Sequence, residues 1–259
     1  MVLSAYTYRQ DGVVMHSFLL VGQSNMAGRG YLDQARPIDT DHIYTLRNGR
    51  WQRMFRPINP DRSFSGVSLA ESFAEAYAQK YGVDVGLICC ADGGTSIDQW
   101  MPGSLLFDNA VYQAKLAART SKIAGILWHQ GESDCTAELY PQYREKLVTV
   151  INAFRKELGL EDIPLIMGGL GEYLAQFPME YFNEINAIMK DVAETSPMTG
   201  YVSAEGLSSN PDNLHFSAES LYTFGLRYFQ EYEKLRKPDF DTDGRDSISD
   251  TARTALELL

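Results

Sequence analysis

The sequence predicts an α/β fold in which helices cover both faces of a central parallel β-sheet, giving a three-layer sandwich. Short apolar runs without alternation, typical of strands buried on both faces, recur along the chain. Longer segments with apolar residues at helical spacing lie between them. Strands that alternate with helices in this way form a parallel sheet, because each crossover helix returns the chain to the same end of the sheet.

The expected strands are short and end at glycine or polar residues. In the first, the apolar run from Phe18 to Val21 stops at Gly22, and three polar residues follow. The expected strands span residues 17–21, 83–90, 123–128, 163–167 and 201–203, with a further short strand at 43–46 before an Asn48–Gly49 turn.

The expected helices have one apolar face each. In the first, Leu69, Phe73 and Tyr77 share a face, and Gly82 ends the helix. We expect helices at residues 68–81, 106–120, 143–158, 179–194 and 217–236. Residues 31–66 contain few periodic segments, and we expect this long loop to form a wall of a functional site.

Length and composition predict one globular domain. The chain has 259 residues, of which 44% are hydrophobic and 22% are charged, as in an ordinary globular protein with a full core. We expect the domain to span residues 1–236 and an acidic tail to span residues 237–259.

Charge and hydropathy argue against several classes of partner. The net charge is −11 and no lysine- or arginine-rich run is present, which disfavours binding to nucleic acid or to an anionic membrane. No apolar run approaches the ~20 residues of a membrane helix, and the N-terminus does not resemble a signal peptide. Cys89, Cys90 and Cys135 are interpreted as buried free thiols, so we expect a reducing, cytoplasmic location.

Four polar segments follow predicted strands, at residues 22–28, 91–100, 129–134 and 205–215. Loops at the carboxyl ends of parallel strands meet at one edge of the sheet. We therefore expect these four segments to form one site.

Ser24, His215 and Asp212 are the candidate catalytic residues. Ser24 lies where a buried strand breaks into a polar turn, although an isolated serine there is more often a helix N-cap. His215 follows Asp212 by three residues, so the carboxylate can accept a hydrogen bond from the imidazole and fix its tautomer. Asp-x-x-His ordinarily marks a solvated turn, and its position in the loop after the last predicted strand is what favours the catalytic interpretation.

The same loops offer donors for an oxyanion. Gly93 has no side chain to obstruct its backbone amide, and Gly94 is the alternative to it. The amide of Ser24 and the side-chain amide of Gln130 are the other candidate donors. Each residue could also have a purely structural role. The two glycines could form a tight turn, and Gln130 could form hydrogen bonds within its loop.

Glu132 and Trp100 remain ambiguous at this stage. Glu132 is either a second acid near the histidine or a residue that pins its loop, and we favour the second role. Trp100 could stack on a sugar face, and packing over the loop is equally consistent with its position.

Four motifs, taken together, resemble one family. Gly-Gln-Ser-Asn-Met-Ala-Gly, Gly-Gly-Thr-Ser-Ile, Trp-His-Gln-Gly-Glu-Ser-Asp and Asp-x-x-His occur in that order within residues 17–232. The chain thereby resembles the sialate O-acetylesterase and acetylxylan esterase branch of the SGNH hydrolases, carbohydrate esterase family 6 and its relatives. No Gly-x-Ser-x-Gly elbow of the α/β-hydrolases is present.

The resemblance implies a flavodoxin-like fold and metal-independent removal of acetyl groups from carbohydrates, without a cofactor. It implies that Ser24 is the nucleophile, His215 the base and Asp212 its partner. The oxyanion hole would then be formed by Ser24, Gly93 and Gln130. We also expect Gln23, Asn25 and Trp100 to contact a small-molecule or oligosaccharide acetyl ester.

The acidic tail contains an incomplete calcium-loop pattern. Residues 239–250 carry Asp at positions 1, 3, 5 and 12 and Gly at position 6, as in half of a dockerin-type module. Asp246 replaces the usual apolar residue at position 8, and Asp250 replaces the usual Glu at position 12. A weak calcium site and a solvated acidic tail both remain open.

Three functions are compatible with the sequence. The favoured one is a serine esterase that removes O-acetyl groups from xylan-type oligosaccharides or sialate through an acyl-enzyme. An SGNH esterase or thioesterase with a non-carbohydrate acyl substrate is the second. A non-catalytic carbohydrate-binding domain is the third, and it is disfavoured because a binding module has no need of all the catalytic parts.

Overall fold

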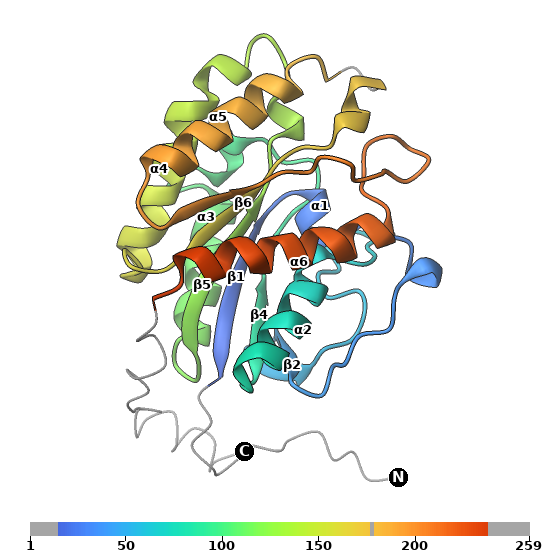
Figure 1. Cartoon of the computed structure of the whole chain (residues 1–259). Coiled ribbons are helices and arrows are strands. Elements are labelled where there is room, and N and C mark those ends of the chain that lie inside the picture. The colour runs from blue at the N-terminus through green and yellow to red at the C-terminus, as the bar shows by residue number, and fades with distance from the viewer. Residues whose placement is uncertain (1–14, 177–178, 238–259) are drawn as a thin grey trace.

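The computed structural model describes residues 15–176 and 179–237 and confirms the α/β three-layer fold (Figure 1). The described strands form one seven-stranded sheet in the order β3-β2-β4-β1-β5-β6-β7. The strands are β1 (His16–Gly22), β2 (Ile43–Arg47), β3 (Arg50–Arg53), β4 (Val85–Cys89), β5 (Lys122–His129), β6 (Leu165–Gly168) and β7 (Thr199–Val202). Every strand pair is parallel except β2 with β3.

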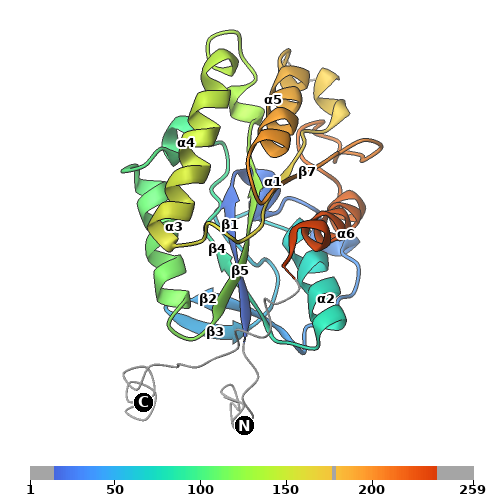
Figure 2. The same cartoon turned by 60° about the vertical axis from the view of Figure 1, so that its left-hand side comes forward.

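Helices cover both faces of the sheet. In Figure 2, α2 and α6 lie on one side of the sheet, and α3, α4 and α5 lie on the other. The α-helices are α1 (Ser24–Ala27), α2 (Leu69–Tyr81), α3 (Leu105–Ala117), α4 (Tyr140–Leu158), α5 (Phe182–Thr195) and α6 (Ala218–Leu235). Short 3₁₀ turns are η1 (Leu32–Gln34), η2 (Ile97–Trp100), η3 (Glu132–Asp134) and η4 (Glu172–Gln176).

The sequence prediction missed β3. This strand reads Arg-Trp-Gln-Arg and has no buried residue, so it produces no apolar run. It pairs with β2 through the predicted Asn48–Gly49 turn, in which both residues have positive φ angles of 50° and 73°. Charged residues suit its place at the edge of the sheet.

Strand β1 lies at the centre of the sheet and carries the candidate nucleophile at its carboxyl end. Its neighbours are β4 on one side and β5 on the other, so the loops after these strands flank the loop after β1. This is the point of an open α/β sheet at which ligands bind. Phe18 of β1 is fully buried and contacts the rings of Phe73 and Tyr77 on α2 at centroid distances of 4.8 Å. Burying such a side chain contributes about 1.5–3 kcal/mol.

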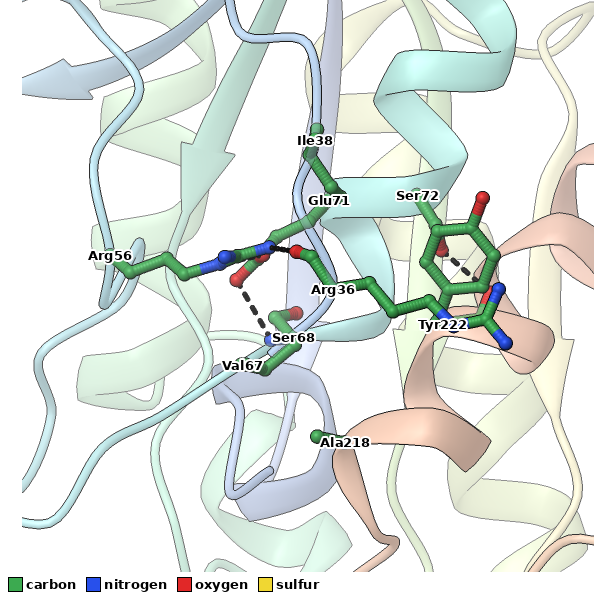
Figure 3. A pocket seen from close by; sticks show the side chains of 9 residues that line it. All are labelled: Arg36, Ile38, Arg56, Val67, Ser68, Glu71, Ser72, Ala218 and Tyr222. Carbon is green, nitrogen blue, oxygen red and sulfur yellow. Dashed lines mark hydrogen bonds and ion pairs between the residues drawn. The ribbon is translucent and has the colours of Figure 1, made fainter. Parts of the chain in front are cut away.

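The segment between α1 and α2 packs against the start of α2. Ser68 and Glu71 form a capping box there, and Arg56 Nε donates to Glu71 Oε2 at 2.7 Å. Figure 3 shows these side chains in a small pocket between this segment, α2 and α6. The N–H of Ser68 also binds Glu71, and Ser72 Oγ donates to the carbonyl of Tyr222. Ser24, His215 and Asp212 do not line this pocket.

The three cysteines are free, with Cys90 and Cys135 buried and Cys89 half-buried. Burial raises the pKa of the Cys89 thiol to about 12, which disfavours the reactive thiolate. In the described part of the chain, no helix has the length and apolar character needed to cross a membrane. The possible calcium loop at residues 239–250 and nearly all of the N-terminal segment before β1 lie outside the described residues.

Gly22→Ala tests the close approach of β1 and β5 beside the site. A Cβ at position 22 would lie 2.1 Å from the carbonyl oxygen of His129. Gly82 is the matched control, because its φ of +64° is left-handed but its surroundings are open. We expect Gly82→Ala to lose roughly 1–2 kcal/mol and Gly22→Ala to lose clearly more, measured by urea unfolding. Equal losses would show that the ends of the two strands separate without cost.

Candidate active site

The predicted loops meet at the carboxyl end of β1. The N–H of Gln23 donates to His129 O at 2.8 Å, and the N–H of Asp92 donates to Gly22 O at 3.0 Å. The loops after β1, β4 and β5 are therefore joined by backbone hydrogen bonds. Ser24 is the first residue of α1, and Gln23 occupies the N-cap position. Ser24 is thus not an N-cap serine, which removes the ordinary interpretation of its position.

Two consecutive hydrogen bonds link the side chains of Ser24, His215 and Asp212. His215 Nε2 lies 3.1 Å from Ser24 Oγ, although the two residues are 191 positions apart in the chain. His215 Nδ1 lies 2.7 Å from Asp212 Oδ2. An ionised Asp212 can only accept a hydrogen bond, so Nδ1 carries the hydrogen, and this assigns Nε2 as the acceptor that faces the serine hydroxyl. The arrangement fits a nucleophile, a general base and a carboxylate that orients the base.

A local turn aligns Asp212 with the imidazole. Asp212 Oδ1 accepts the backbone N–H groups of Leu214 and His215, each at 3.0 Å. Asn213, which follows Asp212, has a left-handed φ of 53°, a conformation that asparagine tolerates well. Burial raises the pKa of Asp212, but these two N–H bonds and His215 more than offset it, so the pKa is lowered.

Asn25 connects the serine loop to both neighbours of His215. Its Oδ1 accepts the N–H of Phe216 at 3.0 Å, and its Nδ2 lies 3.4 Å from the carbonyl oxygen of Leu214. Its Nδ2 also donates to Glu132 Oε1 at 2.6 Å. The Asn25 side chain is 1% exposed, so the expectation that it contacts substrate is corrected: it holds the histidine loop beside Ser24.

Glu132 contacts His129 and Asn25, and no hydrogen bond joins it to His215. His129 Nε2 lies 3.4 Å from Glu132 Oε1, and both side chains are almost completely buried. Burial raises the pKa of Glu132, but His129 and the Asn25 amide offset this effect, so its pKa is below the ordinary value. Glu132 is therefore a buried anion that anchors Asn25.

Gln130 and Gln23 are buried in a polar network behind the serine. Gln130 is fully buried, and its Nε2 donates to Asp134 Oδ2 at 2.6 Å and to Thr95 O at 3.0 Å. Gln23 Oε1, at 3.2 Å, is a third acceptor for the two amide hydrogens of Gln130, and the role of Gln130 as an oxyanion donor stays a prediction. Gln23 Oε1 accepts from Gln130 and from the N–H of Gly131, and at 3% exposure Gln23 does not contact substrate either.

Trp100 packs inside the protein and does not form a sugar platform. Its side chain is fully buried, and its ring lies edge-on to Trp128 at a centroid distance of 5.8 Å. Trp100 Nε1 donates to Thr95 Oγ1 at 3.0 Å, and Thr95 Oγ1 donates to Asp92 O at 2.8 Å. The predicted stacking of Trp100 on a sugar is therefore wrong, and packing, the other interpretation, describes its position.

The Gly93–Gly94 turn borders the serine. A Cβ at Gly93 would lie 3.4 Å from Ser24 Cβ and only 2.4 Å from Arg29 Nη2, so a side chain here would have to displace the Arg29 guanidinium. The N–H of Gly93 donates to Asp61 Oδ2 at 2.9 Å. Gly94 is exposed and has a left-handed φ of +78°. Among the described residues, its N–H has no hydrogen-bond partner.

Sequence reasoning missed the buried ion pair between Arg29 and Asp61. Two bonds of 2.9 and 2.7 Å join the guanidinium to the carboxylate, and the two side chains are 4% and 6% exposed. Burial raises the pKa of Asp61, but hydrogen bonds from Arg29, Ser65 and the N–H of Gly93 outweigh this effect. The pKa of Asp61 is therefore below its ordinary value. The Asn-Pro-Asp turn at residues 59–61 was the available signal, within a segment expected to form a wall of the site.

Glu132→Gln should reduce the acid sensitivity of the fold. Because the pKa of Glu132 is lower in the folded protein, its stabilisation is present above the unfolded value of about 4.3 and is lost as pH falls through the folded pKa. We expect the wild type to lose more unfolding free energy than Glu132→Gln between about pH 6 and about pH 3. Glu138→Gln, at an exposed position, serves as the control in urea unfolding. Identical acid losses in all three proteins would contradict the buried-anion assignment.

Within residues 15–176 and 179–237, no group of three or more His, Cys, Asp or Glu side chains is arranged to hold a metal ion.

Solved structures share this fold. A crystal structure of an Arabidopsis thaliana protein superposes with a TM-score of 0.78 at 26% identity, covering 87% of this chain and all of that chain. The structure of NanS gives a TM-score of 0.67 at 17% identity, over 85% of this chain and 97% of that chain. A carbohydrate acetylesterase from Xanthomonas citri gives 0.62 at 17% identity, over 86% of this chain and 56% of that chain. At 17% identity the last two show the fold alone.

The sequence comparisons identify the family. A probable carbohydrate esterase of Arabidopsis thaliana is 29% identical over 249 residues, which cover 83% of this chain and 89% of the relative. The family model described as carbohydrate esterase, sialic acid-specific acetylesterase, matches residues 14–234. This range contains the loops that carry Ser24, Asp212 and His215. The resemblance seen in the motifs is thus confirmed, and the chain is a carboxylic ester hydrolase of the sialic acid-specific acetylesterase family of carbohydrate esterases.

Proposed function

We propose that this protein removes O-acetyl groups from carbohydrates through a covalent acetyl-serine intermediate. The observation that carries the proposal is the hydrogen-bonded series of Ser24 Oγ, His215 Nε2 and Asp212 Oδ2, with separations of 3.1 and 2.7 Å. Membership of the carbohydrate esterase family supports an acetylated sugar as the substrate class.

In the first step, His215 Nε2 accepts the proton of Ser24 while Oγ attacks the acetyl carbonyl carbon. Asp212 stabilises the imidazolium that forms and keeps the ring in place. The tetrahedral intermediate then collapses, the ester C–O bond breaks, and the sugar hydroxyl leaves with the proton from His215. This leaves the acetyl group on Ser24.

In the second step, water attacks the acetyl-serine carbonyl while His215 accepts its proton. The intermediate releases acetate, and the proton returns to Ser24. Backbone amides suit the developing oxyanion because they are fixed in place before the reaction. The N–H of Ser24 and the Gly93–Gly94 turn beside it are the proposed donors.

The names of structural relatives suggest which sugars to test. The family is described as specific for sialic acid, and one neighbour of low identity, with a TM-score of 0.52, is an acetyl-xylooligosaccharide esterase. O-acetylated sialic acid and acetylated xylo-oligosaccharides are therefore the first substrates to compare.

Substitutions in the triad should separate its roles. We expect Ser24→Ala to abolish hydrolysis of a chromogenic acetate ester, because no nucleophile remains. Asp212→Asn should lower kcat by about 10⁴-fold, since the amide favours the wrong tautomer of His215. Release of the chromophore and of acetate measures both effects.

Ser203→Ala, in the loop after β7, is the control for Ser24→Ala and should keep wild-type activity. Activity that survives in Ser24→Ala contradicts the nucleophile assignment. Equal or better hydrolysis of long acyl esters would favour the non-carbohydrate acyl substrate instead.

On the acid side, the dependence of kcat/KM on pH should correspond to the uptake of a single proton. The backbone hydrogen bonds of Asp212 and its contact with His215 lower the pKa of this carboxyl, so it stays ionised and adds no second proton to the acid limb. We expect log kcat/KM to fall with a slope of one on the acid side. A slope of two would show that a second group must also be ionised.

A further inference from the structure

We propose that Asp61 and Arg62 are positioning residues that orient the Gly93–Gly94 turn so that the N–H of Gly94 faces the reacting ester. The inference rests on the proposed function of the site. Neither residue belongs to a predicted motif, and both come from the segment between α1 and α2.

Consecutive residues hold both backbone polar groups of Gly93. Asp61 Oδ2 accepts the N–H of Gly93 at 2.9 Å, and Arg62 Nη2 donates to its carbonyl oxygen at 2.9 Å. Gly93 can offer no side-chain contacts of its own, so these two bonds define the orientation of its backbone.

The bond from Arg62 also determines where the next amide points. The carbonyl of Gly93 and the N–H of Gly94 belong to one planar trans peptide unit and point in opposite directions. Because Arg62 binds the carbonyl, the N–H of Gly94 is directed away from Arg62. It has no partner among the described residues, as expected of a donor kept for a ligand.

The peptide before Gly93 is fixed in the same way. Its N–H binds Asp61, and its carbonyl, that of Asp92, accepts from Thr95 Oγ1 at 2.8 Å. Trp100 and Gln130 in turn bind Thr95. The turn is thus bound on its inner side by Thr95. On its outer side it is bound by Asp61 and Arg62, which belong to the segment between α1 and α2, here called the wall.

The wall is itself anchored to the serine loop. Arg29 binds both oxygens of Asp61 and also donates to the carbonyl of Gly28 at 2.8 Å, and Ser65 Oγ binds Asp61 at 2.7 Å. Arg62 Nη1 forms a second ion pair, of 2.8 Å, with Asp92. The charge of Asp61 is balanced by Arg29, so the carboxylate can lie beside an oxyanion site without strong repulsion.

Arg62→Ala is the test, because the Arg62 side chain is 42% exposed and its loss should leave the fold intact. We expect kcat for an acetate ester to fall about tenfold or more with KM little changed, since loss of an entire oxyanion donor costs about 10²–10³-fold. Arg62→Lys should recover part of kcat by donating to the same carbonyl. Arg53→Ala, which removes an exposed arginine paired with Asp41, is the matched control and should have no effect.

The rate at which a fluorophosphonate labels Ser24 provides a readout that does not depend on the natural substrate. We expect Arg62→Ala to slow this labelling in parallel with kcat, because the tetrahedral phosphorus adduct also places an oxygen at the oxyanion site. If the wild type labels but does not hydrolyse acetylated sugars, the proposed function fails, while slower labelling of Arg62→Ala would still support the positioning role.

Wild-type kcat and labelling in Arg62→Ala would overturn the inference while leaving the esterase function standing. Asp61→Asn provides a second check, for which we expect slower hydrolysis. Faster hydrolysis by Asp61→Asn would also overturn the inference, because it would show that the carboxylate obstructs the amide of Gly93.

Discussion

The hydrogen bonds of Asn25 are the interaction on which the candidate active site depends. Ser24 and His215 belong to opposite ends of the chain, and no covalent or local constraint brings them together. Asn25 follows the serine directly, and its amide binds the backbone on both sides of the histidine. The distance of 3.1 Å between Ser24 Oγ and His215 Nε2 therefore depends on one buried side chain, that of Asn25, whose amide donates to Glu132.

This arrangement places several polar groups in the protein interior. Buried polar side chains are costly unless they are hydrogen-bonded, but a connected network limits each group to one position. Gln130 Nε2 donates to Gln23 and Asp134 behind the serine, and the Glu132–His129 contact and the Asp61–Arg29 ion pair are buried as well. The candidate triad thus has three residues, while the residues that orient it are more numerous and mostly buried.

The role of the Gly-Gly-Thr-Ser-Ile and His-Gln-Gly-Glu-Ser-Asp motifs follows from the same network. Gln130 and Asp134 of the second motif bind the backbone of Thr95 and Ile97 in the first. These motifs therefore shape one turn beside Ser24. A residue type that suits catalysis, such as a glutamine amide or a tryptophan ring, also suits this support, and the motif alone does not distinguish the two uses.

The sequence by itself determined the order of the main strands and helices, because apolar periodicity follows directly from which faces are buried. Its motifs also singled out Ser24, His215 and Asp212, which the structure places in hydrogen-bond contact with one another. Strand β3 escaped prediction because an exposed edge strand needs no apolar run. Only the tertiary structure decided that Gln23, Asn25, Gln130 and Trp100 lie buried behind the site and that Asp61 and Arg62 reach the Gly93–Gly94 turn. Burial and side-chain direction depend on contacts between segments distant in the chain, and no local pattern of residues records them.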